Sequence, residues 1–138
     1  AAMRFPRAGS GVVDNFHAGG LAAAVLLAEG RLGPATNLGL DADAGWHDRH
    51  PDSGAAIAGR CLPRWQEALE LALRAHRAFG ARVFVGWDLA LLPGGWQLVE
   101  GNAAPDLDII QRTSGRPLGD ARFGQLLAFH TAAALRDR

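Results

Sequence analysis

Two apolar runs on either side of Pro93-Gly94-Gly95 are the clearest feature of the hydrophobic pattern. The runs cover residues 83–92 and 96–102, and the residues between them predict a β-hairpin with a loop at 93–95. With this loop, Asp88 on the first strand lies directly opposite Glu100 on the second.

Three polar side chains interrupt the apolar runs, at Asp88, Glu100 and Asn102. Facing Cβ atoms are about 4.5–5.5 Å apart, so like charges at Asp88 and Glu100 repel. Strand alternation puts Asn102 on the same face as Glu100. Two carboxylates and an amide oxygen together predict a magnesium ion, which prefers oxygen ligands. Two alternatives remain: a loop at 94–95, which would place Glu100 opposite Leu89, and a salt bridge from an arginine to one of the acids.

The rest of the pattern predicts an α+β fold in which helices pack on an antiparallel sheet. Pro63 suits the first turn of a helix that runs to Phe79, and Gly80 marks its end. Asp120 is typical of the N-cap of a last helix. The other segments are predicted to be an extended stretch at 1–7, a turn at 9–11, a strand from Val12-Val13, a strand at Leu21–Ala28 that returns after a turn at 29–33, a loop at 33–54, and a strand at Ala55–Arg60.

Both predicted helices carry an apolar stripe at helical spacing. The stripes consist of Trp65, Leu69, Ala72, His76 and Phe79 in the first helix, and of Phe123, Leu126, Leu127 and His130 in the last. We therefore interpret His76 as a packed core histidine. The hairpin face that packs on the first helix is expected to carry Val83, Val85, Trp87, Leu89, Leu91 and Val99. The opposite face, with Phe84, Gly86, Asp88, Ala90, Leu98, Glu100 and Asn102, is expected to line a covered site.

A polar, glycine-containing segment at residues 14–20 is a second candidate for binding. Asn15 and His17 are polar groups beside Gly19 and Gly20, whose backbone permits close approach or positive φ. A phosphate cradle and a simple polar turn both fit this segment, which matches neither the dinucleotide nor the P-loop pattern. His47 and His50 are interpreted as turn residues rather than zinc ligands, because no helical pattern supports their spacing.

Composition limits the classes of function. The 138 residues suffice for one domain, and 14 basic residues, all arginine, balance 14 acidic ones. A neutral total argues against nucleic acid as a partner. The longest apolar run, Leu21–Ala28, is too short to span a bilayer, and the single Cys61 excludes an internal disulfide. We expect a cytoplasmic protein without a membrane partner.

Several of these segments together resemble the ATP-grasp superfamily. Gly86-Trp87-Asp88, a hairpin and Glu100-Gly101-Asn102 are similar to the metal-binding end of that fold. Arg4, the 14–20 segment, and His50-Pro51-Asp52-Ser53-Gly54 before Pro63-Arg64-Trp65 add to the likeness. Over residues 4–112 the chain looks most like the sugar-transfer-associated group, which is related to alpha-L-glutamate ligases.

The resemblance implies a fold, an activity and a set of site residues. Asp88, Glu100 and Asn102 would bind Mg²⁺ that bridges the phosphates of ATP. Arg4 and Asn15 would serve in catalysis, and together with His17, Gly19 and Gly20 would bind the nucleotide. The activity would be that of an ATP-dependent ligase, which activates a carboxylate as an acyl phosphate for attack by an amine or another nucleophile, so that both substrates are small molecules.

One departure from the family concerns the nucleotide-holding lysines, because the chain contains no lysine. We therefore expect residues 1–138 to be the C-terminal, metal- and phosphate-binding subdomain of a longer chain, inactive without an N-terminal ATP-grasp subdomain as its partner. Two other functions compete with this one. The chain could be a non-catalytic binding or scaffold domain that retains the fold, or a hydrolase that uses Asp88 and Glu100 as acid and base.

Overall fold

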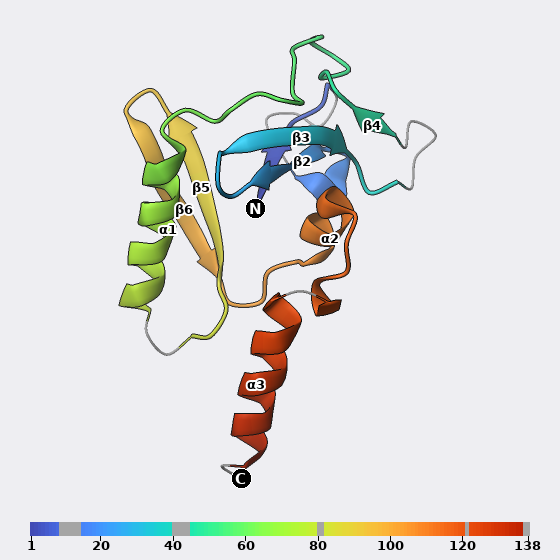
Figure 1. Cartoon of the computed structure of the whole chain (residues 1–138). Coiled ribbons are helices and arrows are strands. Elements are labelled where there is room, and N and C mark those ends of the chain that lie inside the picture. Colours follow the sequence, from blue (N-terminus) through green and yellow to red (C-terminus); the bar gives the residue numbers. More distant parts are fainter. Residues whose placement is uncertain (9–14, 40–44, 80–81, 121, 137–138) are drawn as a thin grey trace.

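Two antiparallel sheets and three α-helices make up the described part of the chain (Figure 1). The structure, a computed structural model, describes residues 1–8, 15–39, 45–79, 82–120 and 122–136. The predicted α+β class, with antiparallel sheets packed against helices, is confirmed. One sheet contains, in this order, β1 (Ala2–Phe5), β2 (Leu21–Leu26), β3 (Arg31–Thr36) and β4 (Trp46–His47); the other is the hairpin of β5 (Gly86–Leu92) and β6 (Gly95–Asn102).

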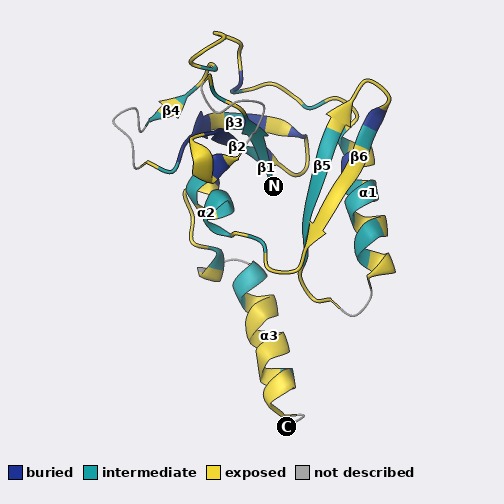
Figure 2. Cartoon of the chain, turned by 180° about the vertical axis from the view of Figure 1, so that it is seen from behind, coloured by how far each residue is buried: buried dark blue, intermediate teal, exposed yellow. Residues whose placement is uncertain are grey.

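The hydrophobic core lies in the four-stranded sheet, where burial is concentrated in Figure 2. β2 is its central element, because β1 and β3 pair with its two edges and α2 (Asp108–Ser114) packs against it. A strand covered in this way has apolar residues at successive positions, which explains the run Leu21-Ala22-Ala23. The buried cluster consists of Leu21, Ala23, Val25, Leu32, Ala35 and Ile57, with Met3, Phe5, Leu62 and Trp65 packed against it.

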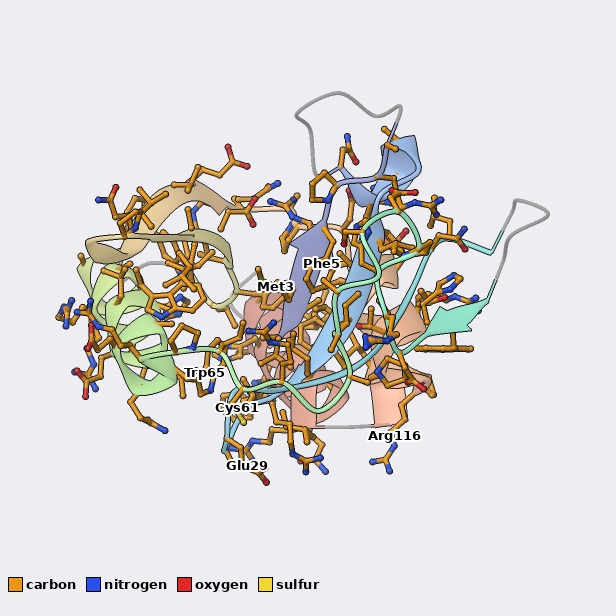
Figure 3. All side chains as sticks on the ribbon, turned by 90° about the horizontal axis from the view of Figure 1, so that it is seen from above. Met3, Phe5, Glu29, Cys61, Trp65 and Arg116 are labelled. Atoms are coloured by element: carbon orange, nitrogen blue, oxygen red, sulfur yellow. The ribbon has the colours of Figure 1, made fainter. Side chains whose placement is uncertain are left out.

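Trp65 connects the core of the four-stranded sheet to the β5–β6 hairpin (Figure 3). It is the first residue of α1 (Trp65–Ala78), and its indole Nε1 donates a hydrogen bond to the carbonyl oxygen of Leu27, at 2.7 Å. Gly30, with φ of 67°, lies so close beneath the ring that a Cβ there would be 2.5 Å from it. On the other side, the Trp65 ring meets the ring of Trp96 from the hairpin edge to face. The helix, the hairpin and the core therefore share one aromatic contact.

α1 covers one face of the hairpin, as its apolar stripe predicts. The ring of Trp87 contacts those of His76 and Phe79 edge to face, and Ala68 is fully buried. His76 packs against the Trp87 ring, as predicted, but it is half-buried and lies outside the hydrophobic core cluster. The charged side chains on the outer surface of α1 are exposed: Glu67, Glu70, Arg74 and Arg77.

The last helix, α3 (Arg122–Arg136), extends away from both sheets in Figure 1. Its predicted stripe lines an apolar groove, where the Phe123 ring lies 4.8 Å from that of Phe84 between centroids. Much of the stripe is exposed, including Leu126 and Leu127. None of the described helices is long and apolar enough to cross a membrane.

Several predicted boundaries are wrong. The expected loop at 33–54 contains the end of β3 and the short strand β4, because Leu32 and Ala35 join the core. The expected strand at 55–60 is a series of turns with one isolated bridge at Ala56, although Ile57 is buried. α1 begins at Trp65 rather than Pro63. Asp120 is the last residue of a short 3-10 helix, η2 (Leu118–Asp120), and the predicted capping of the last helix by its side chain falls outside what the structure describes. The turn predicted at 9–11 and the strand from Val12-Val13 fall outside the described residues.

Candidate functional site

A cleft with a volume of about 750 Å³ lies between β1 and the β5–β6 hairpin. Ligand pockets commonly have volumes of about 300–1,000 Å³. Six of the residues singled out in the sequence come together in its described wall: Arg4, Asn15, His17, Asp88, Glu100 and Asn102. Segments far apart in the chain therefore supply one concave surface.

Arg4 enters the cleft because of its place in β1. Its neighbours Met3 and Phe5 pack on the core, so alternation directs Arg4 to the other face. There its Nη2 donates to Asp88 Oδ2 at 3.1 Å. The two side chains are 38% and 37% exposed, so water screens the pair. The arginine–acid pairing considered as an alternative to a metal site is thus present at Asp88.

The hairpin brings Asp88 opposite Glu100, as predicted, although its turn and the register near the turn differ from the prediction. The turn has two residues, 93–94, because Gly95 adopts φ of 123° and already pairs in β6. This correction of the predicted three-residue loop shifts the pairing near the turn by one position. An irregularity between Asp88 and Leu89 then restores the original register toward the other end of the hairpin.

That irregularity is a β-bulge, and it reverses two predicted side-chain directions. Leu98 pairs with Leu89, whereas Val99 is the extra residue and lines the cleft beside Glu100. Uninterrupted alternation predicts Leu98 on the cleft face and Val99 on the helix face. A bulge adds one residue to one strand, so side chains beyond it point to the opposite face from the one that regular alternation predicts. As a result Glu100 points to the cleft although Leu98 does not line it.

The hairpin supplies a donor set that suits a hard cation. Asp88 and Glu100 face each other, and Asn102 follows on the same side, opposite Gly86. The Oδ1 of Asn102 accepts a hydrogen bond from the backbone N–H of Ala104 at 3.0 Å. A carbonyl oxygen has a second lone pair, so this bond orients the amide and leaves it able to act as a ligand. Within the described ranges, no three His, Cys, Asp or Glu side chains are grouped to hold a metal. Mg²⁺ commonly needs only one or two carboxylates, with water and phosphate as further ligands, and the three residues fit it.

The segment around Asn15 forms a short 3-10 helix, η1 (Phe16–Ala18). The Asn15 side-chain oxygen accepts a hydrogen bond from the backbone N–H of His17 at 2.9 Å, which caps the helix. Gly19 follows with φ of 90°, and Gly20 packs so tightly that a Cβ would be 2.8 Å from the Asn15 carbonyl oxygen. Among the described residues of the cleft wall, neither glycine appears. Both glycines shape the turn that presents Asn15 and His17.

His17 forms an ordered pair with Asp108, the first residue of α2. The His17 Nε2 is 2.7 Å from Asp108 Oδ2, while Asp108 Oδ1 accepts from the backbone N–H of Ile109 at 2.7 Å. Partial burial works to raise the pKa of Asp108, but the hydrogen bonds from His17 and Ile109 outweigh it and lower that pKa below its usual value. An ionised carboxylate can only accept, so Nε2 carries the proton.

Asp106 and Asp108 are the site residues that sequence analysis did not single out. Asp106 lines the cleft, and its Oδ2 is 3.9 Å from His17 Nδ1. Pro105, next to Asp106, packs against Gly86 of the hairpin, where an added Cβ would be 2.5 Å from the proline ring, and this contact holds Asp106 at the cleft. The available signal was the Asp-Leu-Asp sequence, which begins after the three residues that follow Glu-x-Asn.

The charge of the described cleft wall is unbalanced. One guanidinium, that of Arg4, meets three carboxylates, those of Asp88, Glu100 and Asp106. With His17 neutral, the side chains of the wall therefore carry an excess of two negative charges. Polyanionic ligands are repelled by such a surface unless a cation joins them.

Comparison with protein families gives one match. A family described as sugar-transfer associated ATP-grasp matches residues 1–122 of the chain. Comparisons with curated proteins and with solved structures gave no significant match. The matched range contains all the candidate site residues described above.

Proposed function

The chain belongs to the sugar-transfer associated ATP-grasp family, and we propose that it supplies the magnesium- and phosphate-binding wall of an ATP-dependent ligase. In this proposal a carboxylate oxygen attacks the γ-phosphorus of ATP, the bond to ADP breaks, and an acyl phosphate forms. A nucleophile then displaces phosphate from the carbonyl carbon. Phosphoryl transfer of this kind depends mainly on positioning and charge neutralisation, which a wall of charged side chains can provide.

The charge excess of the cleft is the observation that carries the proposal. Three carboxylates against one guanidinium repel a nucleotide unless a divalent cation is bound with it. Two of the carboxylates, Asp88 and Glu100, are opposite each other on the hairpin. Their arrangement supports the use of these two acids, with Asn102, as the cation's protein ligands.

The proposal gives each group a distinct role. Asp88, Glu100 and Asn102 would hold Mg²⁺, which when bound would neutralise charge on the phosphates. Arg4 would donate hydrogen bonds to a phosphate or acyl phosphate oxygen. Asn15 would donate from its amide nitrogen, since its oxygen already caps η1. Gly19 and Gly20 would act by holding the turn that carries Asn15.

The Arg4–Asp88 pair is compatible with these roles on energetic grounds. Both side chains are more than one-third exposed, and exposed ion pairs contribute only about 0–1 kcal/mol. A divalent cation at the acids and an anionic phosphate at the guanidinium would replace the pair with two stronger attractions. We propose that ligand binding exchanges these partners.

The same pair supports the competing function, a binding or scaffold domain without chemistry. Arg4 donates to Asp88 at 3.1 Å and neutralises its charge, so Asp88 could serve only to hold β1 against the hairpin. Glu100 and Asp106 distinguish the two functions. They line the cleft as further carboxylates, and the scaffold role gives no reason for them.

Replacement of Glu100 by glutamine tests the proposal. The amide keeps the shape of the side chain but removes the charge that would face the cation. With the proposed nucleotide-holding subdomain present, we expect magnesium-dependent ADP release to fall by about 100-fold or more, the scale typical for loss of one charge-stabilising group.

Glu70→Gln is the matched control, because Glu70 is an exposed acid on α1 away from the cleft. ADP release should be unchanged in this variant. Equal rates for Glu100→Gln and the parent protein, or release that does not depend on magnesium, would contradict the proposed magnesium site, and no release from the parent protein would favour the scaffold function.

A further inference from the structure

His17 lines the cleft, and its two ring nitrogens lie next to different carboxylates. Its Nε2 donates to Asp108, whose other oxygen is held by the Ile109 N–H. Among the described residues, the cleft wall includes His17 and Asp106 but not Asp108. Asp108 therefore supports the ring from behind, and the neutral imidazole presents an unprotonated Nδ1 on the side of Asp106.

This arrangement suits proton transfer better than metal binding. Asp106 and Asp108 approach opposite nitrogens of the ring, at 3.9 and 2.7 Å, so the three groups do not converge on one point. A carboxylate behind an imidazole fixes its tautomer and stabilises the imidazolium that forms when the other nitrogen accepts a proton. The His17 side chain is 42% exposed, so it can return that proton to water.

Asp106 adds a preference for the charge of the acceptor. Its side chain is 78% exposed and lies too far from Nδ1 for a hydrogen bond. It is an unburied negative charge at the cleft, next to the nitrogen that can accept a proton. A cationic ligand is attracted to such a position, and a protonated amine is the cation that also carries a proton to remove.

We propose that His17 is the general base for an amine acceptor, that Asp108 positions it, and that Asp106 attracts the acceptor's ammonium group. The inference rests on the proposed ligase function and specifies its nucleophile. His17 Nδ1 takes one proton from the ammonium nitrogen, whose freed electron pair attacks the carbonyl carbon of the acyl phosphate. The C–N bond forms, the C–O bond to phosphate breaks, and the amide nitrogen loses its surplus proton to water.

The tautomer of His17 is the first measurement, because it requires no substrate. A long-range ¹H–¹⁵N spectrum of histidine-labelled protein distinguishes a protonated Nε2 from a protonated Nδ1. We expect the neutral ring of His17 to carry its proton on Nε2, with the resonance assigned by its loss in His17→Gln. A proton on Nδ1 would remove the base and overturn the proposal.

Transfer kinetics provide the second measurement, with acceptors that differ in their need for a base. Hydroxylamine is unprotonated at neutral pH, whereas ammonium must lose a proton before it can attack. ADP release is followed with magnesium-ATP, a set of small carboxylic acids, and either hydroxylamine or ammonium chloride. In His17→Gln we expect the ammonium-dependent rate to fall by about 100-fold or more, as general base catalysis contributes about 10²–10⁴-fold. The hydroxylamine-dependent rate should fall far less, because this acceptor does not need a base.

The outcomes separate the two proposals. Equal loss with both acceptors, or loss with neither, overturns the base role of His17 and leaves the ligase function standing. These assays are made with the proposed nucleotide-holding subdomain present; if the wild-type protein then releases no ADP with hydroxylamine and any of the acids, the ligase function fails and the base role falls with it. Glutamine at position 17 can still donate to Asp108, which keeps the fold comparable.

The two acids have distinguishable effects. Asp108→Asn should reproduce the ammonium-specific loss and change the tautomer signal of His17, which a purely structural role would not do. Asp106→Asn should raise the KM for ammonium and leave kcat unchanged, because its proposed role is attraction of the cation. A change in kcat alone would contradict that role.

Discussion

At the scale of single residues, backbone contacts decide how Asn15 and His17 are presented to the cleft. Gly20 is buried against the Asn15 and Phe5 carbonyl oxygens, at 2.8 and 3.2 Å from a would-be Cβ. Both neighbours are main-chain atoms, which cannot move aside as a flexible side chain can. Glycine is therefore required at this position because there is no room for a side chain.

Replacement of Gly20 by alanine tests this requirement. The added methyl group must displace the backbone at residue 15 or 5, and overpacking of this kind costs about 1–3 kcal/mol. We expect the free energy of unfolding, measured by urea denaturation, to fall by that amount.

Gly33→Ala is the control, because its new Cβ would meet only Ala24 atoms at 3.9 Å. Alanine in a strand loses less backbone entropy on folding than glycine, so this variant should be as stable as the parent or slightly more so. Equal stability of the two alanine variants would show that the turn at Gly20 can relax.

Sequence analysis reached some of these residue contacts and missed others for a physical reason. The Asp88–Glu100 pairing was predicted from the local hairpin pattern, whereas Arg4 was assigned to the site only through the family resemblance. The His17–Asp108 pair joins residues 91 positions apart, so it depends on how α2 packs on the sheet. No local pattern encodes that contact.

At the scale of elements, the bulge in β6 shows why a correct pairing can follow from a wrong turn. The predicted loop was one residue too long, and the bulge compensates by adding one residue at Val99. The wrong turn shifts the predicted pairing by one position, and the bulge shifts it back, so Asp88 and Glu100 pair as predicted. Leu98 and Val99 lie between the turn and Glu100, and their predicted directions are therefore wrong. Bulges depend on local twist and ladder geometry, which apolar periodicity does not report.

Trp65 offers the element-scale prediction, because it joins α1 to the core and the hairpin. Trp65→Phe removes the hydrogen bond to the Leu27 carbonyl and should lower the free energy of unfolding by about 0.5–1.5 kcal/mol. Trp65→Ala also removes the contacts with Trp96 and the core. It should cost about 3 kcal/mol, the lower end for tryptophan truncation, since the ring is only partly buried.

Trp46→Ala is the matched control for this pair. Trp46 is 48% exposed, and the Arg112 guanidinium lies 5.5 Å from its ring centroid. Its loss should cost about 0.5–1 kcal/mol, the value of an exposed cation–π contact. Urea denaturation followed by circular dichroism compares all three variants. If Trp65→Ala lowers the free energy of unfolding by no more than Trp46→Ala does, other contacts must hold the hairpin and α1 against the four-stranded sheet.

At the scale of the whole molecule, two carboxylates tie distant segments together. Asp108 binds His17, and Asp52 accepts hydrogen bonds from the backbone N–H of Ala8 at 2.7 Å and from Arg7 Nε at 2.9 Å. The Ala8 N–H, followed by the Arg7 guanidinium, lowers the pKa of Asp52 below its usual value. No local sequence pattern indicates the partners of these acids, because the contacts span 44 to 91 positions.

The lowered pKa values predict the sign of the pH dependence. Each carboxyl group binds its proton more weakly in the folded state than in the unfolded chain, where the pKa of aspartate is about 3.9. Their stabilising effect is therefore complete above about pH 4, and it is lost as the pH falls through the lower, folded-state pKa values. We expect the urea midpoint to decrease on acidification below about pH 4, and Asp52→Asn to reduce both the midpoint at neutral pH and the steepness of the acid decline. Glu70→Gln, which alters an exposed acid on the outer face of α1, serves as the control. An acid decline as steep in Asp52→Asn as in the parent would show that Asp52 does not contribute to it.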